Sequence, residues 1–296
     1  MSDQIGKTAG GPESLMGTFY VVATPIGNLG DISHRALEVV SSVSVVLAED
    51  TRHSRRLFNH YGISTKLRAC HQHNEAELVD WVIRQLGEGH DLALVSDAGT
   101  PLISDPGFVM VRALREQGIN ICAVPGPSSI IAALSIAGLA TNQFVFDGFL
   151  PAKSSARKTQ LQTYLSQSRT IVLLESSHRI EACLADIVEV LGGDRKLVLA
   201  RELTKKFETV LSGTAADVWQ TLRDDPDQSR GEFVLMLEGA APVPEGEMEL
   251  RKLLQVLLQE FPLKQAASLA ARITGGRKNE IYDLALILKS GRDNDS

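Results

Sequence analysis

Cysteine, net positive charge and long apolar runs are all scarce in this sequence. The three cysteines are Cys70, Cys122 and Cys183, which lie far apart and form no C-x-x-C pair. This spacing argues against a disulfide framework or a zinc ribbon, and we expect reduced thiols in the core of a cytoplasmic protein. The formal net charge is −6, which excludes a polycation that binds nucleic acid over its whole surface. The longest apolar run, at residues 130–140, is shorter than the roughly 18 residues of a membrane helix, so no membrane span is expected.

The composition is that of a large globular protein. Apolar residues make up 44% of the chain and charged residues 22%, which supplies enough apolar side chain for sizeable cores and too little charge for disorder. A length of 296 residues predicts about two domains, with room for a small third one. Residues 1–17 contain no apolar segment, and we expect them to form a flexible tail and not a signal peptide.

Residues 18–140 alternate short β-branched runs with helical stretches, which is the pattern of an α/β domain. Strands are predicted at residues 18–23, 44–48, 66–69, 92–95 and 119–124. Helices are predicted between them at residues 32–42, 54–61, 75–86 and 108–117. Strands joined by helical crossovers form a mainly parallel sheet with helices on both faces. A further helix at residues 129–137 is expected to close this domain.

Residues 141–240 are predicted to form a second α/β domain with a core of its own. Its predicted strands cover residues 144–146, 170–174, 197–200, 207–211 and 233–237. Its predicted helices cover residues 156–166, 180–191 and 215–222. The stretch 239–246 is rich in Pro, Gly and Ala, and we expect it to be a linker.

A small helical module is predicted at residues 247–292. Its helices cover residues 253–260, 263–274 and 278–289, and two glycines break the chain before the last one, as in a helix-turn-helix. Residues 250–292 carry eight Lys and Arg against three Asp and Glu, a charge of +5 that leaves −11 for the remainder. This asymmetry favours an RNA-binding module attached to an acidic body. A three-helix cap whose charges are simply solvated explains the same pattern.

Four loops that follow predicted strands are candidates for a ligand site, because ligands of such sheets bind outside the carboxyl ends of the strands. They cover residues 24–31, 49–53, 96–107 and 125–129. In the first, Asp31 is the expected N-cap of the next helix. The second concentrates ionisable residues, and we expect a function for Asp50 or Arg52. The third combines Gly and Pro with acidic residues, which allows backbone to approach a ligand closely.

The motifs of several other protein classes are incomplete. Neither G-x-G-x-x-G nor G-x-S-x-G occurs, which argues against a dinucleotide fold and a serine hydrolase. His71 and His73, with His53 and His60 upstream, have no further partners at metal-ligand spacing. We therefore expect no metal site.

The loops contain eight motifs in a fixed order. They are TPIGNLGDI, AEDTRHS, HNE, VSDAGTPLISDPG, VPGPSS, GFLPAK, ESSHRI and ARELTKKFE, within about residues 20–238. As a set they resemble the tetrapyrrole methylase superfamily, and within it the cytidine 2′-O-methyltransferases of the small-subunit ribosomal RNA methyltransferase I group. The resemblance implies two α/β domains with S-adenosylmethionine (SAM) in the cleft between them, and a homodimer. It also implies 2′-O-methylation of a cytidine in the 16S ribosomal RNA of the 30S subunit.

The same resemblance implies which residues contact the cofactor. In the superfamily a G-D-P loop contacts SAM, and here residues 96–103 fill that place with the variant D-A-G-T-P. This variant separates the subgroup from the porphyrin and precorrin enzymes. The contacts implied are Pro25, Ser96, Asp97, Ala98, Gly99, Thr100, Leu102, Ile103, Ser128, Ser129, Glu175, Ser176, Arg201 and Thr204.

Methylation of a ribose hydroxyl requires alignment with the methyl donor and benefits from a group that accepts the proton. Asp50 and Glu202 are candidates for that base, and ion pairs with neighbouring arginines are the structural alternative for both. Lys205 is a candidate as a deprotonated base or as a cation that stabilises oxyanion charge. Basic side chains are expected to hold RNA phosphates. These are Arg52, Arg55, Lys153, Arg157, Lys158, Lys264, Arg272, Arg277 and Lys278.

Two other functions remain open at this point. The superfamily fold also suits a SAM-dependent methyltransferase of a tetrapyrrole, although the D-A-G-T-P variant and the basic C-terminal residues disfavour it. The other alternative is a non-catalytic RNA-binding assembly factor that has lost SAM binding. The intact Gly- and Pro-rich loops argue against this second alternative.

Overall fold

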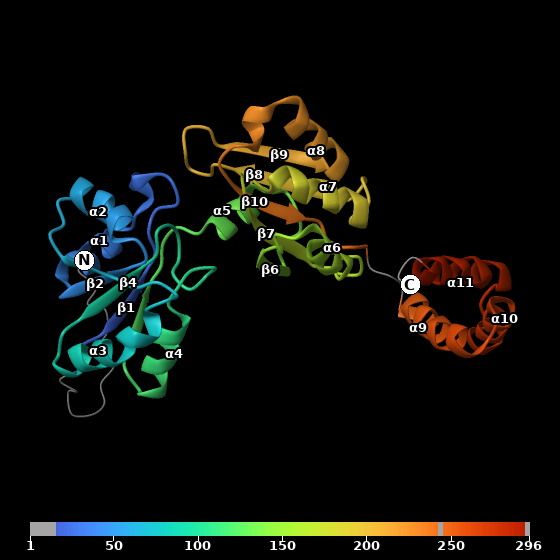
Figure 1. Cartoon of the computed structure of the whole chain (residues 1–296), viewed down its shortest axis with the longest axis horizontal. Coiled ribbons are helices and arrows are strands. Elements are labelled where there is room, and N and C mark those ends of the chain that lie inside the picture. The colour runs from blue at the N-terminus through green and yellow to red at the C-terminus, as the bar shows by residue number, and fades with distance from the viewer. Residues whose placement is uncertain (1–15, 242–244, 294–296) are drawn as a thin grey trace, which may run out of the picture. The chain divides into compact units, whose positions relative to one another are not determined.

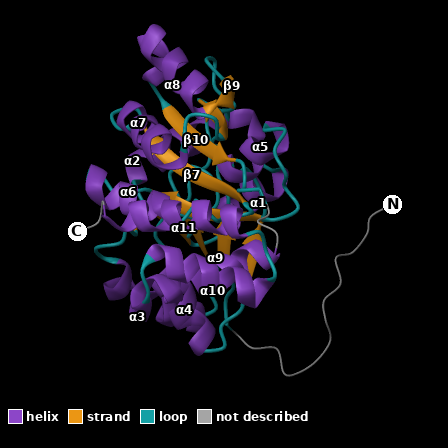
Figure 2. Ribbon diagram, turned by 90° about the vertical axis from the view of Figure 1, so that its right-hand side faces the viewer, coloured by secondary structure: helices purple, strands orange, loops and turns teal. Residues whose placement is uncertain are grey.

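The computed structural model describes residues 16–241 and 245–293, and these fall into two compact units (Figure 1). One unit holds two β-sheets and extends to Glu238, and the other holds the last three helices. Figure 2 distinguishes the strands in orange from the helices in purple. No helix in the described parts of the chain is long and apolar enough to cross a membrane.

The first sheet is parallel throughout, with the strand order β3-β2-β4-β1-β5. Its strands are β1 (Phe19–Val22), β2 (Val45–Ala48), β3 (Lys66–Ala69), β4 (Leu92–Val95) and β5 (Ile121–Val124). They are joined through η1 (Leu29–Asp31), α1 (His34–Ser42), α2 (Thr51–His60), α3 (Glu75–Gly87) and α4 (Phe108–Glu116). The strand and helix order confirms the predicted parallel α/β sheet.

Both faces of this sheet are apolar because side chains alternate along each strand. On β2, Val46 belongs to the cluster that α1 and α2 cover, together with Val40 and Phe58. The next residue, Leu47, belongs to the cluster on the opposite face, which α3 and α4 cover. A strand that is buried on both faces needs an apolar residue at every position, which explains the continuous run at Val45–Ala48.

The second sheet is mixed, with the strand order β6-β7-β10-β8-β9. Its strands are β6 (Phe144–Phe149), β7 (Thr170–Ser176), β8 (Lys196–Arg201), β9 (Thr209–Thr214) and β10 (Glu232–Leu237). The other elements are α5 (Ser129–Ile136), α6 (Ser154–Gln162), α7 (Ile180–Leu191), α8 (Ala215–Asp224) and η2 (Pro226–Ser229). Only β6 and β7 pair in parallel, whereas β10 runs antiparallel to both of its neighbours.

The helix α5 packs on the second sheet, which corrects the expectation that it closes the first domain. Ile130, Ala133 and Leu134 are buried in one cluster with Val198 of β8 and Val234 of β10. The helices α6, α7 and α8 contribute to the core cluster on the other face. This sheet therefore depends on a helix that precedes all of its strands, because α5 supplies the apolar cover of one face.

Several predicted boundaries are wrong. The helix predicted at 156–166 is α6 (Ser154–Gln162), and the strand predicted at 207–211 is β9 (Thr209–Thr214). Three further differences concern helix starts and the N-terminal tail. The helix predicted from residue 54 begins at Thr51, because the side chain of Asp50 accepts a hydrogen bond from the backbone N–H of Arg52 and acts as its N-cap. Asp31 lies within η1, and Ser33 caps α1 instead. Gly17 was expected in the tail, but it is buried, so the expected tail extends at least one residue too far.

The second unit consists of α9 (Glu245–Glu260), α10 (Leu263–Thr274) and α11 (Lys278–Asp293). They bury a small core that includes Leu254, Ala267 and Ile281. Gly275 has a φ of 71° and ends α10 in the left-handed conformation, a role for which glycine is favoured. The predicted helix-turn-helix arrangement therefore has a structural basis in this unit.

Acidic residues at the start of α9 offset most of the positive charge that was expected for this unit. The expected linker, residues 239–246, overlaps α9 at Glu245 and Gly246, and residues 242–244 lie outside the described part. Glu245–Asp293 contains eight Lys and Arg against seven Asp and Glu, a net charge of +1. The charge of +5 holds only from residue 250 onward, so net charge no longer distinguishes the RNA-binding interpretation.

Candidate functional site

A cavity of about 440 Å³ lies within the first unit, lined by residues of both sheets. This volume lies within the roughly 300–1,000 Å³ typical of small-molecule sites. From the loops of the first sheet come Ile26, Ala98, Ile103, Ser104 and Asp105. From α5 and the second sheet with its loops come Ser129, Phe149, Leu174–Ser177, Ala200, Leu203 and Gly231–Val234. We call it the first cavity.

Two loops of the first cavity have strained backbone. Among described residues other than glycine, positive φ angles occur at four positions, which are Leu102, Ser104, Glu202 and Thr204. The first two flank Ile103 in the β4–α4 loop, and the other two flank Leu203 in the β8–β9 loop. Both central residues line the cavity. Backbone strain of this kind is concentrated at ligand-binding and catalytic sites.

The polar lining of the first cavity is acidic. Its ionisable members among the described residues are Asp105, Glu175 and Glu232, and no Lys, Arg or His lines it. Glu175 is 3% exposed; one of its carboxylate oxygens accepts a hydrogen bond from the N–H of Ser176 and lies 3.2 Å from Nε of Arg179. The other oxygen is buried without a hydrogen-bond partner. Since carboxylates and no described cation line this cavity, it suits a ligand that carries positive charge.

Lys205 ties the β8–β9 loop to the start of β10. Its Nζ donates to Glu202 at 2.8 Å and to Glu232 at 2.9 Å. Burial raises the pKa of Glu202, but the hydrogen bonds from Lys205 and from the N–H of Glu232 bring the net pKa below its ordinary value. Burial lowers the pKa of Lys205, but its two carboxylate partners bring the net pKa above the ordinary value. Lys205 is therefore a cation and Glu202 an anion at neutral pH.

Asp50 is engaged in local structure at the start of α2. The side chain of Arg52 donates to both of its carboxylate oxygens, at 3.1 and 2.8 Å. Hydrogen bonds from the side chain and backbone of Arg52 lower the pKa of Asp50 to about 2. Its own N–H donates to the carboxylate of Asp97 at 3.1 Å. A carboxylate with so low a pKa is a weak general base at neutral pH.

A second cavity of about 330 Å³ shares part of its wall with the first. Ser104 and Asp105 line both cavities. The rest of the second cavity comes from Glu49, Gln72, Glu75 and the turn Pro106–Phe108. Burial is the main cause that raises the pKa of Asp105 and of Glu49 above the ordinary values.

Five of the residues implied to contact the cofactor line the first cavity. They are Ala98, Ile103, Ser129, Glu175 and Ser176. A smaller cavity between the β1–η1 loop and α2 is lined by Pro25, Ser96 and Asp97. The others do not appear among the residues that line these cavities, and some have structural contacts. Ser128 caps α5, Thr100 donates to the carbonyl of Pro127, and Arg201 donates to the carbonyl of Arg230.

Several lining residues of the first cavity were missed by sequence reasoning. Gly231–Val234 lie at the start of β10, which pairs with β7 so that Phe233 is opposite Glu175. This antiparallel pairing brings the amino end of one strand to the carboxyl end of another, and no sequence signal predicted it. Asp105 lies inside the 96–107 loop that was predicted to bind a ligand, and its acidity at the end of a Gly- and Pro-rich loop was the available signal.

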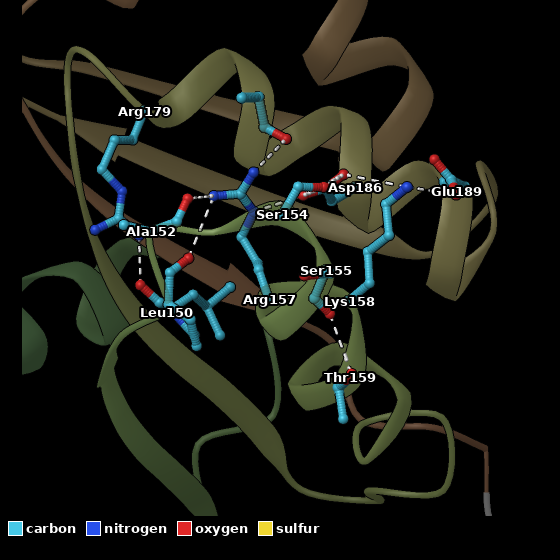
Figure 3. A network of polar contacts seen from close by, with 12 residues as sticks. Leu150, Ala152, Ser154, Ser155, Arg157, Lys158, Thr159, Arg179, Asp186 and Glu189 are labelled. Atoms are coloured by element: carbon cyan, nitrogen blue, oxygen red, sulfur yellow. Dashed lines mark hydrogen bonds and ion pairs between the residues drawn. The ribbon is translucent and has the colours of Figure 1, made fainter.

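The expectation that Arg157 binds RNA phosphate is wrong in this structure, because its side chain is buried. Figure 3 shows the polar contacts that it makes there. Its Nε donates to Asp186 at 2.6 Å, and its other nitrogens donate to the carbonyls of Pro151, Ala152 and Ala182. Four of the five N–H donors of this guanidinium therefore have partners inside the protein, and its burial keeps a phosphate from reaching it.

The other predicted phosphate ligands are more accessible. Lys158 is partly exposed and pairs with Glu189 at 2.6 Å. The side chain of Arg52 is 90% exposed although it pairs with Asp50. The remaining ones are exposed and comprise Arg55, Lys153, Lys264, Arg272, Arg277 and Lys278. In the described parts of the chain no three His, Cys, Asp or Glu side chains are grouped as metal ligands.

The chain matches two family models. Residues 18–218 match "Tetrapyrrole (Corrin/Porphyrin) Methylases", and residues 244–289 match "RsmI C-terminal HTH domain". A protein of Pseudomonas aeruginosa named "Ribosomal RNA small subunit methyltransferase I" is 53% identical over 91% of this chain and 97% of its own length. A protein of Escherichia coli O157:H7 with the same name is 46% identical over 93% of this chain and 96% of its own length. The chain belongs to the ribosomal RNA small subunit methyltransferase I family of tetrapyrrole methylases.

Solved structures agree with the tetrapyrrole methylase fold. The uroporphyrin-III-C-methyltransferase of Thermus thermophilus is 22% identical, with a TM-score of 0.52 over 75% of this chain and 94% of that one. The methyltransferase CobJ is 16% identical, with a TM-score of 0.57 over 76% of this chain and 95% of that one. At these identities the likeness shows the fold alone.

Membership of the ribosomal RNA small subunit methyltransferase I family implies SAM as the methyl donor. The first cavity fits SAM, which carries a sulfonium and an ammonium group against one carboxylate and is therefore a cation. The negative charge of Asp105, Glu175 and Glu232 along its lining favours such a cation. Ile103 and Leu203 offer apolar contact for the adenine ring or the thioether carbons.

Proposed function

We propose that this protein methylates the 2′-hydroxyl of a cytidine in the 16S ribosomal RNA of the small ribosomal subunit, with SAM as the methyl donor. The observation that carries the proposal is the acidic first cavity between two strained loops, in a chain that matches relatives named for ribosomal RNA methylation along most of its length. Residues that touch this cavity are the ones we expect to hold SAM, with Glu175, Ser129 and Ser176 as polar contacts.

A tetrapyrrole is a poorer substrate for these cavities. Uroporphyrinogen and precorrins carry several carboxylates, and both cavities are lined by carboxylates without a Lys or Arg among the described lining residues. Like charges in a partly desolvated site repel each other. The neutral sugar and base of a nucleotide do not suffer this repulsion, which favours RNA over a tetrapyrrole.

SAM, when bound, supplies an electrophilic methyl group on a sulfonium centre. The chain's own residues then have to align the ribose hydroxyl and remove its proton. Lys205 and Glu202 form an ion pair, so we assign them to hold the β8–β9 loop in place. A catalytic role for Asp50, Glu202 or Lys205 stays a prediction, and the low pKa of Asp50 makes it the weakest base of the three.

The exposed basic residues of α2 and of the second unit are proposed to hold RNA phosphates. Arg52 and Arg55 lie on α2, and Arg277 and Lys278 lie around the start of α11. Phosphate contacts position the RNA, whereas contacts to base and ribose select the nucleotide. We further propose that the enzyme acts in the cytoplasm as a homodimer on the 30S subunit and needs no metal ion.

Transfer of a radiolabelled methyl group from SAM tests this function. The acceptors are 30S subunits, naked 16S RNA and uroporphyrinogen, followed by nuclease mapping and ribose analysis of the product. We expect label on the 2′-oxygen of one cytidine. Label on the tetrapyrrole alone overturns the substrate, and absence of SAM binding by calorimetry would favour a non-catalytic assembly factor.

A further inference from the structure

We propose that the second cavity receives the target nucleoside and that Asp105, in the wall it shares with the first cavity, is the base that accepts the 2′-hydroxyl proton. This inference rests on the proposed function. It assigns the nucleoside and the cofactor to adjacent cavities and puts one carboxylate where the two meet.

The second cavity lies where a substrate of this fold is expected. Glu49 follows β2, Gln72 follows β3 and Asp105 follows β4, and these three strands are neighbours in the parallel sheet. Ligands of such sheets bind outside the carboxyl ends of the strands. The first cavity is lined by Ala98, Ile103 and Ser129, which the family resemblance implies as cofactor contacts, and this marks it as the cofactor side.

The charge of the second cavity selects the neutral part of a nucleotide. Its ionisable residues are Glu49, Glu75 and Asp105, and no cation is present among its described lining residues. A phosphate is therefore repelled, whereas ribose hydroxyls and the exocyclic amino group of cytosine are donors that carboxylates accept. Arg52 lies three residues beyond Glu49 with an exposed side chain, and it offers the flanking phosphate a partner outside the cavity.

Phe108 supplies an aromatic surface at the edge of this cavity. It is 64% exposed at the start of α4 and lines the second cavity. The preceding residue, Gly107, has a φ of 125°, and a Cβ there would lie 2.6 Å from Leu94. Only glycine fits this close approach, so the backbone holds Phe108 at the cavity edge. Nucleobases that leave a stack are commonly bound on such aromatic rings.

The surroundings of Asp105 suit a proton acceptor. The polar and charged groups that face it are Ser96 and Asp97 at the end of β4, with Glu49 at the end of β2. Burial and the negative charge of Asp97 raise the pKa of Asp105, while a hydrogen bond from Ser96 opposes them. A carboxylate with a raised pKa is a better general base than Asp50, whose pKa is about 2.

The chemical step is balanced without another reactant. The bond between the 2′-oxygen and the methyl carbon forms while the bond between sulfur and that carbon breaks, and the electron pair of the broken bond stays on sulfur. The hydroxyl proton moves to the carboxylate of Asp105. The positive charge of the sulfonium and the negative charge of the carboxylate are both neutralised in this step. The total charge of the reacting groups therefore stays the same.

Asp105→Asn tests the role of the base in the full-length protein with RNA as the acceptor. We expect kcat to fall by roughly 10²- to 10⁴-fold, with a far smaller loss of SAM affinity by calorimetry. Wild-type kcat should fall on the acid side as Asp105 becomes protonated, and the variant should lose this acid limb. Asp105→Glu should restore part of kcat. Asp80→Asn, on the exposed face of α3, makes the same charge change away from both cavities and should leave kcat unchanged.

Phe108→Ala tests the nucleoside cavity without relying on turnover. The probe is a fluorescent oligoribonucleotide with one unpaired cytidine, and anisotropy measures its binding to the protein without SAM. Loss of one stacking contact should weaken binding by roughly 5- to 150-fold. Phe144→Ala removes an exposed ring that lines neither cavity and should have no effect.

The outcomes separate this inference from the proposed function. If the wild-type protein transfers no methyl group to RNA, the function and the inference both fail. If the wild type is active but Asp105→Asn keeps kcat within threefold and retains the acid limb, only the assignment of the base is wrong. If Phe108→Ala binds the oligonucleotide as the wild type does, the nucleoside lies elsewhere. Since Phe108 is exposed, its replacement should not unfold the protein, and the test remains available if Asp105 variants are unstable.

Discussion

Ile103 and Leu203 line the same cavity, and each is flanked on both sides by non-glycine residues with positive φ. One belongs to the β4–α4 loop of the first sheet and the other to the β8–β9 loop of the second. Each left-handed residue costs of order 1 kcal/mol or more, so tertiary contacts have to hold both loops. For Leu203 these contacts include the ion pair between Lys205 and Glu202.

Gly27→Ala should distort the contact between the β1–η1 loop and the β8–β9 loop. A Cβ at residue 27 would lie 2.4 Å from Cγ of Lys205 and 3.0 Å from the carbonyl oxygen of Leu203. We expect a loss of about 1–3 kcal/mol in unfolding free energy and weaker SAM binding, measured by urea denaturation and calorimetry. Gly87→Ala has open space at its Cβ and serves as the control, with stability unchanged or up to about 1 kcal/mol higher. Normal SAM binding by Gly27→Ala would contradict the close approach.

Lys205→Met should weaken SAM binding more than it lowers kcat. The substitution removes both hydrogen bonds of Nζ and releases Glu232, which lines the first cavity. We expect a loss of about 1–2 kcal/mol in cofactor binding, a factor of roughly 5 to 30. Lys205→Arg should recover most of the affinity. A large fall in kcat with unchanged SAM affinity would instead make Lys205 a catalytic residue.

Asp50→Asn should change how the unfolding free energy depends on pH, but it should have little effect on methyl transfer. The pKa of Asp50 is lowered from 3.8 to about 2 in the folded state, so its ionised form stabilises the fold at pH values above 3.8. That stabilisation is lost as the pH falls toward 2. The difference in unfolding free energy between wild type and variant should therefore shrink over this range. We expect methyl transfer at neutral pH to stay within a few fold, and a loss comparable to that of Asp105→Asn would restore Asp50 as the base.

Arg157→Met should strongly destabilise the second sheet and its helices. It removes the closest cation from buried Asp186 and leaves only Lys158, at 3.7 Å, and the loss of one partner of a buried ion pair typically costs about 3–5 kcal/mol. Lys158→Met is the control, because its partly exposed ion pairs contribute about 1 kcal/mol or less. Urea denaturation of the two variants measures this difference. The double variant Arg157→Met, Asp186→Leu should be more stable than Arg157→Met alone, and equal stability would argue against the buried charge of Asp186 as the cause.

Exchange of the basic residues of the second unit for Gln should weaken RNA binding without affecting SAM binding. Lys264, Arg272, Arg277 and Lys278 are exposed, while the core of this unit is formed by other residues. Each lost phosphate contact should lower the slope of log K against log salt by roughly 0.7. Arg84→Gln, at an exposed position of α3, is the single-charge control. An unchanged salt slope would favour the cap with solvated charges.

Local patterns in the sequence determined many of the helices and strands in both units. The strands at Lys66–Ala69 and Leu92–Val95 and the helices at Ile180–Leu191 and Leu263–Thr274 agree with the predicted ranges. These segments are short, apolar or strongly periodic, and turn residues bound them, so neighbouring residues alone decide their conformation. The loop motifs likewise determined the family, because each motif is contiguous in the chain.

The partners of these segments were decided only by the tertiary structure. The apolar sequence of α5 predicts that this helix is buried, but it does not predict which sheet the helix packs on. In the structure α5 packs on the second sheet. The guanidinium of Arg157 has the same sequence signal as an exposed phosphate ligand, and its burial depends on Asp186, 29 residues away. Asp105 and Gly231–Val234 meet at one cavity only through strand order and antiparallel pairing. The sequence therefore determined the helices, the strands and the family. Which residues form the site was decided by packing between distant parts of the chain, because the energy of such a contact depends on residues that no local sequence pattern connects.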